Sequence, residues 1–565
     1  MKIQNYSKYG LIFLLFFTFI NCEDLEYDET SFNTKETVFV EFARSKSFLS
    51  AIYAYLPSDF NSVDGAMRAT ASDEAEHVND LSDVQKFNDG TWSAIQPLDD
   101  VWGNMYAGIR ASNMFLVESA GQTFPELKYN DTYADQMAQY NNYPFEARFL
   151  RAFFYFELVK RYKNIPLITT VLTPEEAANV EQKSFTEIVD FIVSECDAIA
   201  PKLPLSYANF TGAKETGRAT RGAALALKAR MLLYAASPLH NPGNDVLLWQ
   251  KAAQAAKAVI DLNTYSLASS YATVVNNTSL SPGPELILER REAASNGFER
   301  RNFPIGYEGG GTGTCPSQNL VDAYEMRING LPITDPASRY NPASPYAGRD
   351  ARLAQTILFN GAQWKGTAVE SFFGGKNGLP LANATKTGYY LRKYVVESIN
   401  LDPKVGAIGS REHTWTLFRY GEILLNYAEA VNEGYGGPEF SVPSTTTPPT
   451  AALTATQAVN LLRNRVTITR FPNGMSQDAF RTKLRNERRV ELAFEDHRFW
   501  DIRRWKIGDQ TKDIFAMNIT RGTNNALTFA VKLLEVRPFS ERMYLYPIPQ
   551  SEIFKNAKLK QNEGW

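Results

Sequence analysis

The chain has 565 residues, more than one simple core usually holds, and its length alone allows two to four domains. Hydrophobic residues make up 44% and charged residues 21%, as in an ordinary globular protein, and aromatic residues reach 13%. The 59 basic and 62 acidic residues form no basic block, so we expect no nucleic-acid partner.

The amino terminus predicts a secreted lipoprotein. Lys2 and Lys8 precede an apolar run at 11–20, which is too short to cross a bilayer as a helix, since a span needs roughly 20 residues. A charged start followed by a short apolar run is typical of a signal peptide, here residues 1–21. Cys22 follows directly and resembles the acylated cysteine of a bacterial lipobox. The alternative is an ordinary membrane anchor.

Residues 22–36 are polar and acidic, and we expect them to form a tether behind the lipid. Their stretch EDLEYDET resembles the surface-export signal of Bacteroidetes lipoproteins. The same charges also fit a plain solvated tether, and the two interpretations are compatible.

Neither cysteine nor histidine chemistry is indicated in the mature chain. Cys196 lies in an apolar helical pattern and Cys315 in a glycine-rich loop, so the two do not suggest a disulfide. The four histidines are scattered and no CxxC occurs, so we expect no metal site and no cofactor. The sequence also lacks GxSxG and HExxH, which argues against an enzyme.

Residues 37–267 are expected to be mainly helical. Apolar positions recur at helical spacing, and Ser184 or Thr186 is placed to cap one helix, with Glu187 beyond it. Helix pairs with small residues at their crossings resemble tetratricopeptide repeats, although no strict period of about 34 residues is legible. The predicted helices are 38–56, 99–120, 145–165, 184–204, 218–237 and 249–262, with a polar loop at 67–96.

Residues 268–565 begin with a different texture. From about 268 to 410 helical periodicity fades while glycine, proline, asparagine and aromatic residues rise. This predicts an ordered, loop-rich region that carries a binding surface. Helical patterns resume at 414–437 and 458–468. We expect this part and residues 37–267 to form one compact body.

The stretch 485–505, RNERRVELAFEDHRFWDIRRW, holds six arginines and five carboxylates. In a helix, Glu487, Glu491 and Glu495 form a row at spacing four, which is favourable only if guanidinium groups interleave with it. One interpretation is an acid/base pair or a phosphate site. The interpretation we favour is a partly buried ladder of ion pairs that fixes how helices stack, because the two signs are interleaved. The arginines expected to interleave are Arg488, Arg489 and Arg498.

The pattern ELAFEDHRFWDIRRW resembles a characteristic segment of the SusD/RagB family of surface lipoproteins. Other segments match the family in order and spacing, among them DDVWGNMYAGIRASNMFL, RFLRAFFYFELVKRYKNIPLI, PSQNLVDAYEM, RYGEILLNYAEAVNE and YPIPQSEI. Together they cover nearly the whole chain after Cys22. The resemblance implies a mainly α fold, in which four tetratricopeptide-like helix pairs form a superhelical body with the loop-rich irregular region packed on it.

The resemblance also implies a role. Members of this family capture nutrients for SusC-like TonB-dependent transporters in the outer membrane of Bacteroidetes, without catalysis. We therefore expect a surface-exposed, lipid-anchored protein of the outer membrane that captures oligosaccharides or polysaccharide fragments and delivers them to such a transporter. A RagB-like protein with peptide ligands is one alternative. Less favoured alternatives are a lipid-anchored glycoside hydrolase with two carboxylates and a helical scaffold that binds only proteins.

The candidate ligand-binding residues are aromatic rings with polar neighbours, because glycan sites combine a ring platform with hydrogen-bonding groups. Trp92 lies in the polar loop with Asp73 and Asn88 nearby, and family members often place a platform ring in this region. The alternative is that Trp92 plugs the helix pair behind it. In the irregular region, the candidates beside glycine-rich turns are Tyr307, Trp364 and Phe372.

Overall fold

The computed structural model describes residues 34–207, 217–275 and 283–565. The predicted signal peptide, Cys22 and most of the predicted tether lie outside these residues. The described chain begins with helix α2 (Lys35–Phe39), where the Thr34 hydroxyl accepts a hydrogen bond from the Thr37 backbone N–H. None of the described helices is both long enough and apolar enough to cross a membrane.

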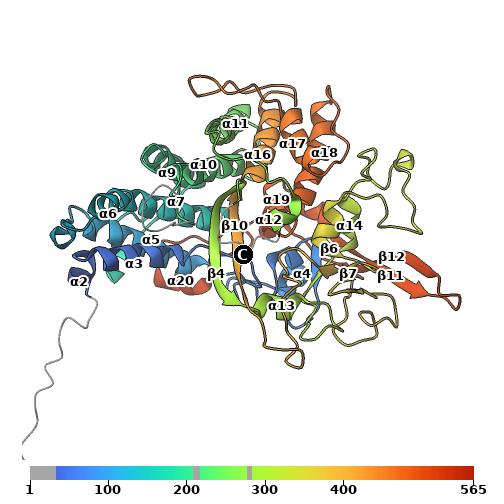
Figure 1. The fold of residues 1–565 in the computed structure, drawn as a ribbon. Helices are drawn as coiled ribbons and strands as arrows, with labels where there is room; N and C mark the ends of the chain where they lie inside the picture. The colour runs from blue at the N-terminus through green and yellow to red at the C-terminus, as the bar shows by residue number, and fades with distance from the viewer. Residues whose placement is uncertain (1–33, 208–216, 276–282) are drawn as a thin grey trace, which may run out of the picture.

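One half of the molecule is a row of helices, each packed against the next (Figure 1). The last two helices of the row come after the irregular region in sequence, so residues on both sides of position 268 build the same layer. The pattern of predicted helices is confirmed, with boundaries shifted by a few residues. In order, the row consists of α3 (Phe42–Tyr53), α5 (Trp102–Glu118), α7 (Tyr143–Tyr162), α9 (Phe185–Ile199), α10 (Arg221–Ala236), α11 (Val246–Asp261), α16 (Tyr420–Gly434) and α17 (Ala455–Arg465).

Local sequence explains how these helices begin and how closely they pack. Ser184 caps α9: its hydroxyl accepts from the Glu187 N–H (3.3 Å), and the Glu187 carboxylate accepts from the Ser184 N–H (2.8 Å). Gly108 of α5 lies where a Cβ would come within 2.7 Å of the Phe154 ring of α7. A small residue at this crossing therefore lets the two helices approach closely.

The other half is loop-rich, as predicted, and holds most of the strands, which pair antiparallel in two-stranded sheets; only the β2–β3 pair among the described strands lies beside the helical row, between α7 and α9. One of the two long pairs corrects one prediction: residues 414–419 were expected to be helical, but they belong to β10, which pairs with β4 before α16 begins. Threonine and aromatic residues alternate there, which favours a strand. The pairs are β1 (Ala75–His77) with β5 (Thr314–Pro316), β2 (Ile165–Pro166) with β3 (Gln182–Lys183), β4 (Leu286–Ser295) with β10 (Arg411–Arg419), β6 (Ile357–Leu358) with β9 (Tyr390–Leu391), β7 (Gln363–Trp364) with β8 (Thr367–Ala368), and β11 (Asp513–Arg521) with β12 (Leu527–Val536).

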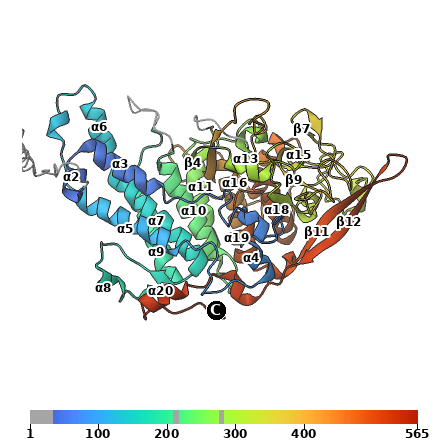
Figure 2. The ribbon, with the colours of Figure 1, turned by 90° about the horizontal axis from the view of Figure 1, so that it is seen from below.

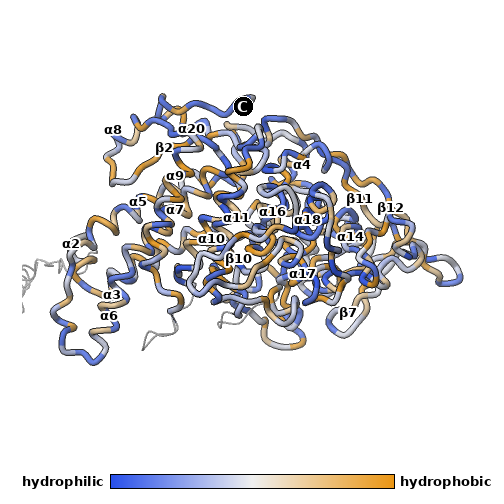
Figure 3. The backbone as a smooth tube through the Cα atoms, turned by 90° about the horizontal axis from the view of Figure 1, so that it is seen from above, coloured by the Kyte–Doolittle hydropathy of each residue, from blue (hydrophilic) through white to orange (hydrophobic). Residues whose placement is uncertain are grey.

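The two halves share one continuous hydrophobic core, which runs from Phe39 to Leu559. The hairpin of β11 and β12 projects from the loop-rich half, on the side away from α2 (Figure 2), and ends in a hydrophilic tip (Figure 3). The remaining helices, most of them short, pack around the core. They are α4 (Gln85–Asp89), α6 (Tyr133–Tyr140), α8 (Pro174–Ala177), α12 (Tyr271–Val275), α13 (Gly297–Asn302), α14 (Gln318–Ala323), α15 (Arg352–Thr356), α18 (Gln477–Glu491), α19 (Arg498–Arg504) and α20 (Gln550–Lys555).

Candidate functional site

The arginine-rich stretch 485–505 does not form one helix. Helix α18 ends at Glu491, and α19 begins at Arg498. Between them, Phe494 and Asp496 each have a φ of 60°, which turns the chain.

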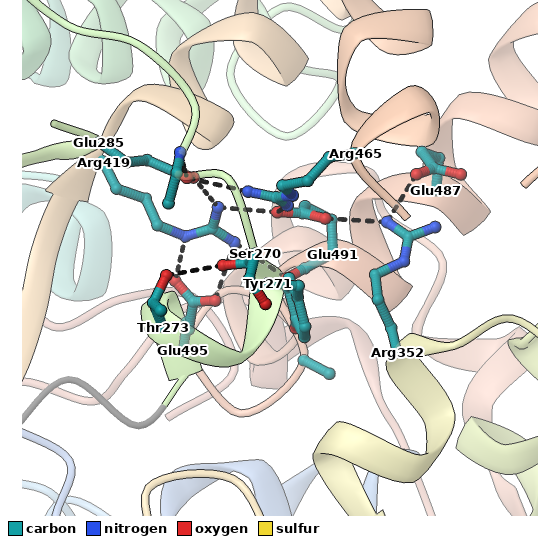
Figure 4. Close-up of polar contacts among 12 residues, drawn as sticks. Ser270, Tyr271, Thr273, Glu285, Arg352, Arg419, Arg465, Glu487, Glu491 and Glu495 are labelled. Atoms are coloured by element: carbon teal, nitrogen blue, oxygen red, sulfur yellow. Dashed lines mark hydrogen bonds and ion pairs between the residues drawn. The ribbon is translucent and has the colours of Figure 1, made fainter. Parts of the chain in front are cut away.

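The acidic row nevertheless lies in the core with arginines between its members (Figure 4). Arg352 donates to Glu487 (2.7 Å) and to Glu491 (2.8 Å). Arg419 joins Glu491 (2.8 Å) to Glu495 (2.7 Å). The interleaving groups therefore come from α15 and β10, which are distant in sequence. Three further cations complete the network: Lys393, Arg463 and Arg465.

The charge state of this network argues against a general acid among the three glutamates. Burial raises the pKa of Glu491, but the charges of Arg465, Arg419 and Arg352 outweigh burial and hold that pKa far below its ordinary value. The same balance lowers the pKa of Glu487 and of Glu495. A general acid at neutral pH needs a raised pKa instead. The ion-pair ladder is therefore the interpretation that the structure confirms.

The arginines expected to interleave with the row bind other partners, and one of these partners is a predicted ligand residue. Arg498 and Arg489 lie 2.8 Å and 3.0 Å from the carboxylate of Asp73. Burial raises the pKa of Asp73, but Arg489 and Arg498 lower it to about 2. Arg488 pairs with Asp501 (2.8 Å). The buried Asp73 carboxylate thus links the 67–96 segment to α18 and α19. This corrects the prediction that Asp73 belongs to a ligand site.

Trp92 and Asn88 are also buried. The Trp92 side chain is 1% exposed, with the rings of Trp565 and Tyr546 at centroid distances of 4.5 and 5.1 Å. The Asn88 amide donates to the Thr70 carbonyl (3.2 Å). As placed, neither side chain offers a surface to a ligand. The platform prediction for Trp92 is corrected in favour of the alternative, in which Trp92 fills the core.

In the irregular region, burial separates the candidates. Trp364 is 1% exposed and lies edge-on to Phe303 at 5.4 Å. Phe372 is also buried, whereas its neighbour Phe373 is 60% exposed. The exposed member of this pair is therefore Phe373 and not the predicted Phe372, and two adjacent phenylalanines in a loop give no sign in the sequence of which one faces out. Tyr307 remains partly exposed.

Tyr307 lies against the hairpin of β7 and β8. The two turn residues of this hairpin, Lys365 and Gly366, have φ of 47° and 76°, and positive φ at both positions is typical of a type I′ turn. Trp364 anchors the hairpin in the core, while Lys365 and Thr367 are exposed. The hairpin thus presents polar side chains on a rigid base.

We refer to Tyr307, Lys365, Thr367 and Lys376 as the hairpin face. The Tyr307 hydroxyl lies 2.9 Å from the Thr367 hydroxyl, to which the Lys376 ammonium also donates (3.0 Å). The Lys376 ammonium lies 5.5 Å from the centre of the Tyr307 ring. The face therefore combines a ring, two hydroxyls and the Lys376 ammonium, which suits an oxygen-rich ligand. The Lys365 ammonium, at the turn of the same hairpin, donates to the carbonyls of Glu397 and Ile399 (2.8 Å each). The two lysines and Thr367 were not predicted from the sequence, because the members of the hairpin face come from three separate loops. The turn-like sequence WKG was the one local sign that residues here are exposed.

Several grooves lie elsewhere on the described residues. One, about 1200 Å³, runs between the C-terminal tail and the β2–β3 region. Its carboxamides are engaged internally: Gln182 donates to the Asn164 carbonyl (3.0 Å) and Asn562 to the Tyr546 carbonyl (2.7 Å). Another, about 530 Å³, is mainly apolar and lies between α5 and α20. Within 34–207, 217–275 and 283–565, no group of three or more His, Cys, Asp or Glu side chains is arranged to hold a metal ion.

Comparison with known proteins identifies the family. The sequence profile of the SusD family matches residues 284–565, and a second profile, described as starch-binding associating with outer membrane, matches residues 28–233. The chain belongs to the SusD/RagB family. A SusD-like protein of Formosa agariphila, P25, is 24% identical over 598 residues, covering 100% of this chain and 99% of that protein.

Solved structures confirm the SusD-like fold. A SusD-like protein from Bacteroides fragilis is 28% identical, with a TM-score of 0.76 over 95% of this chain and 99% of its own. A SusD-like carbohydrate-binding protein from the same species is 26% identical, with a TM-score of 0.72 over 93% and 100% of the two chains. The predicted mainly α architecture with tetratricopeptide-like helix pairs is therefore correct.

Proposed function

We propose that this SusD/RagB-family protein captures glycans at the cell surface without cleaving them and passes them to a SusC-like TonB-dependent transporter. The observation that carries this proposal is the likeness over nearly the full chain to a solved SusD-like carbohydrate-binding protein. The description of the profile that matches residues 28–233 supports the same ligand class and an outer-membrane location.

The hairpin face is the proposed contact surface for the glycan. It lies in the loop-rich half, at some distance from the row of helices (Figure 1). The partly exposed Tyr307 ring can pack against the apolar face of a sugar, while Thr367 and Lys376 can bond its hydroxyls. The 60% exposed Phe373 extends the aromatic surface nearby.

The remaining parts of the role follow from the amino terminus and from the family. Acylation of Cys22 would hold the protein on the outer membrane behind its acidic tether, facing outward. Import would be left to the transporter, which receives the captured glycan. The acidic row of α18 is engaged by arginines, which agrees with capture without hydrolysis.

Calorimetric titration of the chain from Glu23 onward against a panel of polysaccharides and a peptide mixture tests this proposal. We expect heat with at least one glycan, no cleavage products in the same samples, and weaker binding in Tyr307→Ala. Phe554→Ala is the matched control, since Phe554 is an 81% exposed ring on α20. Binding of peptides alone would move the protein to the RagB-like alternative, and release of sugars would overturn the non-catalytic role.

A further inference from the structure

Neither lysine of the hairpin face forms a direct ion pair through its ammonium group with a carboxylate of the described residues. The Lys376 ammonium donates to the Thr367 hydroxyl, and the Lys365 ammonium donates to two backbone carbonyls at 2.8 Å each. Among the described residues, neither ammonium has a carboxylate oxygen within 4.0 Å. Two lysines that also lie over aromatic rings differ in this respect. Lys160 is paired with Glu157 (2.7 Å) and Lys483 with Glu325 (3.0 Å).

Acidic residues lie on the surrounding loops without contacting either ammonium directly: burial lowers the pKa of Lys365, and the charge of Glu397 opposes this only in part. The Glu397 carboxylate accepts from the Lys365 backbone N–H (2.6 Å) and lies 3.6 Å from Arg392. The Glu370 carboxylate accepts a long bond (3.4 Å) from the Lys376 backbone N–H. Both contacts involve backbone groups of the lysines instead of their ammonium groups. Glu308 is exposed on the loop that carries Tyr307.

We infer that the hairpin face binds an acidic sugar residue, one that carries a carboxylate or a sulfate group. This inference rests on the proposed function and names its ligand class. Both groups present anionic oxygens that accept charge-assisted hydrogen bonds from an ammonium. A lysine acts as a mobile point charge and suits either geometry. A neutral sugar would leave the Lys376 ammonium without an ion-pair partner, whereas an acidic sugar packed against Tyr307 would supply one.

The test is titration of the chain from Glu23 onward with polygalacturonate, dextran sulfate and neutral dextran, at low and at physiological salt. We expect at least one acidic polymer to bind about tenfold or more tightly than dextran, and to weaken as salt screens the charges. The double variant Lys365→Gln/Lys376→Gln should lose roughly tenfold of that affinity, since an exposed charge pair contributes up to about fivefold. Which polymer binds distinguishes carboxylate from sulfate.

Lys251→Gln, an exposed lysine on α11, is the matched control and should bind like the unmodified chain. Circular dichroism spectra check that the variants are folded. The inference is overturned if dextran binds as tightly as the acidic polymers, if the double variant keeps full affinity, or if Lys251→Gln loses as much. Those outcomes leave glycan capture standing. If no glycan binds, either in this titration or in the wider panel, the proposed function is overturned as well.

Discussion

The ring of Trp565 lies edge-on to Trp92, with centroids 4.5 Å apart and 66° between the ring planes. The Trp565 indole N–H donates to the carbonyls of Arg542 (3.0 Å) and Leu545 (3.1 Å). These bonds fix the Trp565 ring within the C-terminal part of the chain, and the ring contact joins that part to the segment that carries Trp92. Two segments that are far apart in the sequence therefore share one aromatic cluster, and the Trp92 ring is packed inside that cluster.

Replacement of Trp92 by alanine should lower the free energy of unfolding by about 3–5 kcal/mol, because it leaves a large cavity in the core. Glycan affinity of the folded variant should stay unchanged. Urea unfolding followed by circular dichroism measures the first quantity and calorimetry the second. Phe554→Ala, at an exposed ring, should change stability by less than about 0.5 kcal/mol. A stable Trp92→Ala protein that has lost glycan binding would show instead that Trp92 reaches the ligand.

Replacement of Arg419 by methionine should destabilise the fold by about 3–5 kcal/mol, because it leaves Glu491 and Glu495 buried without a shared counter-charge. Thermal and urea unfolding of the purified chain measure the effect. Arg44→Met removes an arginine whose ion pair with Glu41 is solvent-exposed, so a change within about 0.5 kcal/mol is expected there. Equal effects of the two substitutions would contradict the structural role of the buried network.

Asp73 and Glu74 are adjacent in sequence but should respond to pH in opposite directions. The pKa of Asp73 is lowered to about 2, below its ordinary 3.8, so Asp73 stabilises the fold above pH 4 and loses this effect as pH falls toward 2. Asp73→Asn should therefore cost about 2–3 kcal/mol at pH 7 and less near pH 3. Urea unfolding over this pH range measures the trend. A cost that does not change with pH would contradict the ion pairs with Arg489 and Arg498.

Burial raises the pKa of Glu74 from 4.5 to about 7, and the charges of Arg489 and Arg498 offset it only in part. The ionised carboxylate is thus penalised in the fold, fully above pH 7 and not at all below pH 4.5. Glu74→Gln should stabilise the protein by up to about 3 kcal/mol at pH 8 and be nearly neutral at pH 4.5. The same urea series measures it, and destabilisation at pH 8 would contradict the assignment.

Two glycines of α5 provide a matched pair of substitutions. A Cβ at Gly108 would come within 2.7 Å of the Phe154 ring, whereas a Cβ at Gly103 would have no atom within 4 Å. Gly108→Ala should therefore destabilise by about 1–3 kcal/mol, and Gly103→Ala should stabilise by about 0.5–1 kcal/mol through its better helix propensity. Thermal unfolding of both variants measures the difference, and the same sign for both would contradict close packing of α5 on α7.

Most of the helical layer was predictable because helices leave local signals. The period of apolar residues, the capping pair Ser184 and Glu187, and small residues such as Gly108 are all readable over short distances. The strand at 411–419 was misread because its apolar residues run directly into those of α16. Whether such a run is a strand depends on its partner β4, which lies more than a hundred residues earlier.

The candidate site was less predictable, because aromatic type and loop position do not determine exposure. Trp92, Trp364 and Phe372 sit in polar or glycine-rich sequence yet are buried by rings and loops from elsewhere. The four members of the hairpin face carry no shared motif, since their contacts join three loops.

The sequence by itself therefore determined the class of this protein: the helical repeats, the loop-rich insertion and the family, each encoded in local periodicity or in motifs of contiguous residues. Only the tertiary structure decided which charges and rings are occupied by the fold. Arg352 and Arg419, not the neighbouring arginines, neutralise the acidic row, and Trp565 closes over Trp92. The physical reason is that burial and charge pairing depend on distances between segments that are far apart along the chain.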